Sequence, residues 1–135
     1  MVRRRPSLGV FGIFGRSPRL RQLDQAFRAN DLHPRLVPEA VKLTIISLLE
    51  DHATGAEPAP QAYAAAAEIV SYCMLGAGAF VSEDEPERLA AIERRIDRAL
   101  EFTSTLDAKL LLLTLHARII QPSVVEQFGL ESVGE

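Results

Sequence analysis

Hydrophobic residues recur every three or four positions along most of this chain, the spacing that places them on one face of an α-helix. The clearest case is residues 86–103, where apolar side chains fall on one face and charged side chains cover the other. The face expected to pack on the core contains Leu89, Ile92, Ile96, Ala99, Leu100 and Thr103. No segment alternates apolar and polar residues as a half-buried β-strand does, so the pattern predicts an all-α fold.

Start and stop signals divide the chain into five or six helices. Proline is favoured at the first helical position and glycine just after the last one, and Ser82 with Glu85 has the form of a capping box. The predicted helices are 18–30, 38–53, 60–75, 86–103, 106–120 and a short one at 122–128. The linker 54–60 separates segments that are each too short to fold alone, so all helices are expected to share one core.

Two of these segments are apolar on nearly every side. Residues 62–81 carry one charged side chain, Glu68, and the helix 106–120 contains four consecutive leucines. Such a helix is surrounded either by protein or by lipid. Because residues 62–81 are rich in alanine and glycine and their acidic flank gives no positive-inside signal, we expect a core helix and no membrane span. The sequence therefore predicts a single compact bundle, irregular or orthogonal, with two largely buried central helices and Glu68 at the surface.

Charge is distributed unevenly along the chain. Residues 1–35 carry eight arginines against two aspartates, a net +6, whereas the remaining hundred residues carry seven basic and sixteen acidic side chains, a net −9. Residues 8–15 read LGVFGIFG, and glycine at this density disfavours a helix. We therefore expect residues 1–17 to form a basic arm and residues 18–135 to form an all-helical domain.

The arm and the first helix give the strongest functional signal, because they mix arginines with aromatic residues. A small apolar cluster rimmed by arginine suits a protein interface. The predicted contact residues are Arg3, Arg4, Arg5, Phe11, Phe14, Arg16, Arg19 and Arg21. The leading interpretation is a non-catalytic interaction or adaptor module that contacts a protein partner or a second copy of itself, as in a homodimer.

Three other interpretations fit the same residues. The arginines of the arm suit an anionic membrane surface or another polyanion. The three helices 38–53, 60–75 and 106–120 suit a bundle that holds a small apolar ligand between them. The arm also suits a segment that folds back on the acidic body of its own domain.

The chain shows no pattern typical of an enzyme. It contains no nucleophile elbow, no His-Glu-x-x-His, no dinucleotide-binding glycine loop and no carboxylate pair in an apolar setting. The side chains His33, His52, His116 and Cys73 lack the local spacing of a metal site, and Cys73 is expected to be a buried, unreactive thiol. No helix carries the polar and basic residues that read DNA bases. The sequence predicts no metal, no cofactor and no sequence-specific nucleic-acid binding.

The chain contains one cysteine, which excludes an intrachain disulfide and makes a reducing cytoplasm the simplest compartment. The N-terminal arginines and the short apolar run after them lack the cleavage site of a signal peptide. Arginines outnumber lysines thirteen to two, which is typical of proteins from GC-rich bacterial genomes. We therefore expect a small bacterial protein of the cytoplasm.

Overall fold

The structure, a computed structural model, describes residues 17–82 and 84–130. Within these ranges the chain forms seven α-helices and one 3-10 helix, and no β-strand. The helices are α2 (Pro18–Ala29), η1 (Pro34–Leu36), α3 (Glu39–His52), α4 (Pro60–Leu75), α5 (Ala77–Phe80), α6 (Pro86–Glu101), α7 (Leu106–His116) and α8 (Pro122–Phe128). The all-α fold is confirmed, with one short helix more than the five or six expected.

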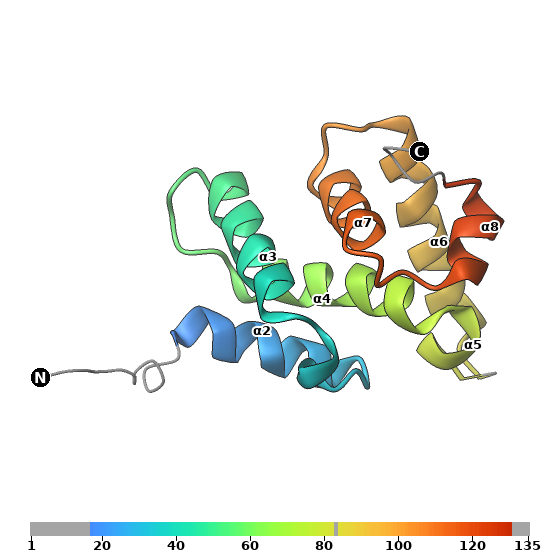
Figure 1. Cartoon of the computed structure of the whole chain (residues 1–135), viewed down its shortest axis with the longest axis horizontal. Helices are drawn as coiled ribbons and strands as arrows, with labels where there is room; N and C mark the ends of the chain where they lie inside the picture. Colours follow the sequence, from blue (N-terminus) through green and yellow to red (C-terminus); the bar gives the residue numbers. More distant parts are fainter. Residues whose placement is uncertain (1–16, 83, 131–135) are drawn as a thin grey trace, which may run out of the picture.

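Helix α4 forms the axis of the molecule and contacts α2, α3, α5, α6 and α7 (Figure 1). Helices α2 and α3 cover its first part, while α6, α7 and α8 gather around its second part (Figure 1). Its side chains Tyr63, Ile69 and Tyr72 are at most 1% exposed. The predicted core role of this segment is therefore confirmed. None of the helices in the described ranges has the length and apolar character needed to cross a membrane.

Most helix starts follow the sequence signals. Proline occupies the first turn of α2, α4, α6 and α8, and Ser17 caps α2 by accepting a hydrogen bond from the Leu20 amide at 3.1 Å. The capping box expected at Ser82 is wrong in detail. Helix α6 begins at Pro86 with Glu85 at its cap, and the Ser82 amide donates to the Glu85 carboxylate in the preceding turn.

The additional helix, α5, follows from the backbone of Gly76. This residue has φ of 82°, a left-handed value that ends α4 and redirects the chain. One further helical turn then places Phe80 in the core, where its ring meets that of Tyr72 edge-on at 5.6 Å. The sequence signals treat this stretch as the frayed end of a helix, because they do not show that Phe80 has a buried partner.

Helix α7 is central, as expected, because it contacts α3, α4 and α6. Two details differ from the sequence pattern. The helix ends at His116, four residues early, and the polar residue Thr114 is buried with its hydroxyl donating to the Leu111 carbonyl at 2.7 Å. Its outer face is open, since Leu112 is 43% exposed. That open face forms part of the site described next.

Candidate functional site

Six of the eight predicted contact residues lie outside the described residues: Arg3, Arg4, Arg5, Phe11, Phe14 and Arg16. The other two, Arg19 and Arg21, lie on the first turn of α2. Arg21 is exposed, whereas Arg19 is partly buried. The predicted role of the arm in binding therefore stays a prediction.

Arg19 is engaged within its own chain. Its guanidinium donates to the carboxylate of Glu50 at the end of α3 and to that of Glu57 in the following linker, the latter at 2.8 Å. The hydrogen bond from Arg19 lowers the pKa of the Glu57 carboxyl, and the two carboxylates raise the pKa of Arg19. Arg19 thus joins α2 to the α3–α4 linker, which matches the reading that some of these arginines are satisfied by the acidic body.

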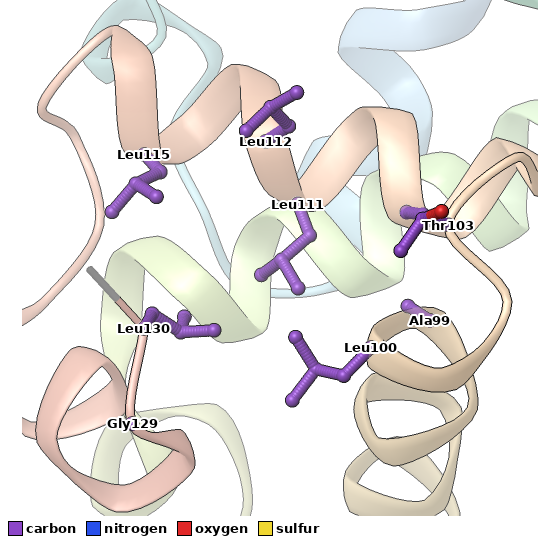
Figure 2. Close-up of a pocket in the computed structure, with 9 residues that line it drawn as sticks. Ala99, Leu100, Thr103, Leu111, Leu112, Leu115, Gly129 and Leu130 are labelled. Atoms are coloured by element: carbon purple, nitrogen blue, oxygen red, sulfur yellow. The ribbon is translucent and has the colours of Figure 1, made fainter. Parts of the chain in front are cut away.

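An apolar groove lies between the end of α6, the outer face of α7 and the end of α8. It encloses about 270 Å³ and is lined by Ala99, Leu100, Thr103, Ala108, Leu111, Leu112, Leu115, Gly129 and Leu130. Figure 2 shows Leu100, Leu111 and Leu130 directed toward one shared space from these three elements. We refer to this feature as the apolar groove.

The groove has a buried floor and an exposed rim. Ala99, Leu111 and Leu130 form the floor and are 2%, 5% and 9% exposed. Leu100 and Leu112 form the rim and are 42% and 43% exposed, so nearly half of each leucine faces water. A leucine in this position gains free energy when a partner covers it.

The floor depends on how α8 ends. Gly129 adopts a left-handed backbone with φ of 64°, and the Leu130 amide then donates to the Val125 carbonyl at 2.9 Å. This arrangement is a Schellman motif, in which the residue after the glycine turns back onto the helix. It brings the Leu130 side chain under the groove, so a glycine that the sequence marks as a helix stop also helps to build the site.

The rim arises because the apolar face of α6 extends beyond the helices that cover it. Ile92, Ile96 and Ala99 of this face are buried as predicted. The prediction is wrong for the next two positions, since Leu100 and Thr103 are exposed and line the groove. Their spacing shows that they share a face with the core residues. It does not show where the neighbouring helix stops, so this part of the site could not be found from the pattern.

A cluster of four charged side chains fixes α6 against α4 and α7; we call Glu68, Arg88, Arg95 and Asp107 the ionic cluster. Arg95 donates twice to Asp107, at 2.8 and 3.0 Å, and once to Glu68, at 3.0 Å. Burial lowers the pKa of Arg95, but the Asp107 and Glu68 carboxylates outweigh it and raise the pKa overall. Glu68, expected at the surface, is half-buried between two arginines.

Arg88 connects the start of α6 to the other half of the molecule. It donates to the side-chain oxygen of Asn30, at the end of α2, at 2.7 Å, and to the Phe80 carbonyl at 3.3 Å. Its guanidinium also lies 4.2 Å from the centre of the Phe80 ring, a cation–π contact. The sequence does not single out Arg88 or Arg95, because their partners are up to 58 residues away.

Two further hollows, of about 370 and 350 Å³, flank the N-terminus of α7, and both contain Ser104 and Thr105. One also contains Arg98 and the other contains His52 and Lys109, and all five of these residues are exposed. His52 is thus on the surface. Both hollows also have an apolar lining: Phe102 and the buried Ala99 in the first, and Leu48 and Leu106 in the second.

The soft metal ligands do not meet in the described part of the chain, where no group of three or more histidine, cysteine or acidic residues is placed to hold a metal ion. Cys73 is fully buried, as expected. Burial raises the pKa of its thiol from 9.0 to about 12. The thiolate is therefore scarce at neutral pH, and Cys73 is a poor nucleophile in this fold.

Comparison of the chain with protein-family models, with curated proteins and with solved structures gives no match. Function must then follow from geometry. The ionic cluster is satisfied within the chain. Exposed large apolar side chains also occur at Leu36, Leu43 and Phe102. The apolar groove joins two such side chains, Leu100 and Leu112, to a buried apolar floor, and we therefore take it as the candidate site.

Proposed function

We propose that this protein is a non-catalytic interaction module that binds an apolar protein segment in the groove between α6, α7 and α8. The observation that supports this proposal is the exposed rim formed by Leu100 and Leu112 above a buried apolar floor. Binding sites commonly combine a concave apolar surface with a polar surround. The groove has this composition, since exposed charged residues such as Glu101 and Lys109 lie beside it.

The energetics favour occupation of the groove. Removing a leucine side chain from water contributes about 1.5–3 kcal/mol when the whole side chain is buried. The two rim leucines are each more than half buried already, so covering both contributes about the value of one complete leucine. That contribution changes an equilibrium constant about tenfold or more. A few apolar side chains of a partner are thus enough for a measurable interaction.

The size of the groove separates a protein segment from a small ligand. Small-molecule pockets usually enclose about 300–1,000 Å³, and the groove encloses about 270 Å³. This volume accommodates one or two large side chains better than an entire cofactor-sized molecule. A small apolar ligand is the second candidate occupant. The hollow between the end of α3 and the start of α7 is the other place for it, near the helices between which the sequence pattern predicts a ligand.

The proposal is tested by selecting random dodecapeptides on the immobilised protein and measuring their affinity by fluorescence anisotropy. We expect the selected peptides to share two or three large apolar residues. The variant Leu112→Glu should weaken their binding at least about tenfold, because a charge then stands on the rim.

The matched control is Leu43→Glu, which changes a leucine that is 50% exposed on α3 and does not line the groove. It should leave peptide affinity unchanged. Selected peptides that bind Leu112→Glu and Leu100→Glu as tightly as the unchanged protein would contradict the proposal. A failure to enrich any peptide would do the same.

A further inference from the structure

The chain itself contains a segment with the chemistry that the groove requires. Residues 8–14 read LGVFGIF, so five of seven are large and apolar, and the glycines at 9 and 12 disfavour a helix. Phe11 and Phe14 are its two largest side chains, and one or two side chains of this size match the volume of the groove.

Charge also favours this segment as the occupant. Residues 1–16 carry four arginines and no acidic residue, whereas residues 17–135 carry eleven basic and eighteen acidic side chains, a net −7. The groove lies where α6 and α8 end, and the C-terminal end of a helix carries partial negative charge. Glu101, next to the rim leucine Leu100, is exposed. Lys109 stands beside the α7 wall, so the surface that is complementary to the arginines flanking residues 8–14 is the α6 side of the groove, at Glu101.

Helix α2, to which the arm is joined, starts on the side of the molecule away from its own groove (Figure 1). Three extended residues span about 10 Å and six span about 20 Å, which limits how far Phe14 and Phe11 reach from Ser17. Ser17 begins α2, at the opposite end of the long axis from α6, α7 and α8 (Figure 1). The other end of α2, at Asn30, meets Arg88 at the start of α6. The groove lies at the far end of that helix.

We propose that the groove binds residues 8–14 of a second copy of this chain. This inference rests on the proposed function of the groove and names its occupant. When two copies exchange arms, both grooves are filled and the assembly closes as a dimer with the same contact made twice. The predicted arm and the apolar groove are then the two halves of one interface.

The test measures self-association of the full chain by sedimentation equilibrium between about 1 and 100 µM, a range that covers the affinities of ordinary protein pairs. We expect a dimer. The self-association of the double variant Phe11→Ser, Phe14→Ser should be at least about tenfold weaker than that of the unchanged chain. The same weakening is expected for Leu112→Glu. Leu43→Glu should associate like the unchanged chain. Raising the salt concentration should weaken the dimer, because exposed arginine contacts are screened.

A mixing experiment identifies the two halves. The Leu112→Glu chain keeps its arm, and the Phe11→Ser, Phe14→Ser chain keeps its groove. Together they should form a one-to-one heterodimer although neither associates alone. A far-UV spectrum that matches the unchanged chain controls for folding, and Leu100→Glu replaces Leu112→Glu if that variant does not fold.

Three results overturn this inference: a full chain that stays monomeric at 100 µM, a dimer that persists without the two phenylalanines, or no heterodimer on mixing. None of them affects the selection of dodecapeptides by the groove. The proposed function can therefore survive the loss of this inference.

Discussion

At the scale of single residues, three helix ends use a left-handed backbone without glycine. Asp31, Thr54 and Arg118 have φ of 61°, 53° and 61°. The residue after each of them donates its amide to a carbonyl five positions back, as in a Schellman motif. This backbone costs an ordinary residue about 1–2 kcal/mol, and the β-branched Thr54 is the least suited of the three.

Replacing Thr54 with glycine should stabilise the fold. The Thr54 hydroxyl donates only to the neighbouring Ala53 carbonyl at an exposed position, so little is lost. We expect Thr54→Gly to raise the free energy of unfolding by about 1 kcal/mol, measured by urea titration. The control Ala91→Gly, at an exposed position inside α6, should lower it by about 1 kcal/mol. Equal signs for the two variants would refute the account.

Tyr72 is the second residue with a measurable consequence. Its ring is fully buried, and within the described residues its hydroxyl has no hydrogen-bond partner. Burial, followed by the nearby Glu93 carboxylate, raises the pKa of Tyr72 from 10.0 to about 12. Because the folded state holds this proton more tightly than the unfolded state, stability is full below about pH 10 and falls as the pH rises toward 12.

The variant Tyr72→Phe should therefore lose less stability than the unchanged chain between pH 9.5 and 11. At pH 7 it should be equally stable or slightly more stable, because it removes a buried hydroxyl without a partner. Urea titrations across this pH range measure both effects. Cys73, with its own raised pKa, adds to the alkaline loss in both proteins and so does not affect their difference. If the free energy of unfolding falls equally with pH in both proteins, the pKa of Tyr72 is not raised by burial.

At the scale of helices, the contact between Arg95 of α6 and Asp107 of α7 should be worth more than a surface ion pair. It is bidentate and partly buried, and hydrogen bonds to charged groups contribute about 1.5–3 kcal/mol. A double-mutant cycle with Arg95→Ala and Asp107→Ala should give a coupling free energy of about 1–2 kcal/mol.

The control cycle uses Arg94 and Asp97, which lie three residues apart on the exposed face of α6. Exposed pairs at this spacing contribute only about 0.2–0.5 kcal/mol. The two cycles share a helix and a charge type, so their difference reports burial and geometry. Similar coupling energies in both cycles would mean that the ionic cluster does not fix α6.

Helix starts were predictable because they depend on local stereochemistry. Pro18, Pro60, Pro86 and Pro122 each begin a helix, since a proline in the first turn loses no hydrogen bond. Helix ends were less predictable, because a residue such as Arg118 adopts a left-handed backbone only when the surrounding structure requires it. Helix α5 was missed for a similar reason: its place is set by Phe80 against Tyr72, two residues of different helices.

At the scale of the whole molecule, the division between core and site could not be predicted. A period of 3.6 residues shows which side chains of α6 share a face, and Ala99 and Leu100 both belong to it. One is 2% exposed and the other 42%, because α7 and α8 cover only part of that face. The arm was singled out by its composition, whereas the groove that we propose it binds exists only after three distant segments have packed together.

Helix α6 is held unequally along its length. Arg88 and Arg95 join its first two-thirds to α2, α4 and α7, while its last turn, with Leu100, is exposed. Segments with few buried contacts open at a lower free-energy cost than the core. We therefore expect the wall of the groove that Leu100 forms to open at a lower free-energy cost than the first two-thirds of α6.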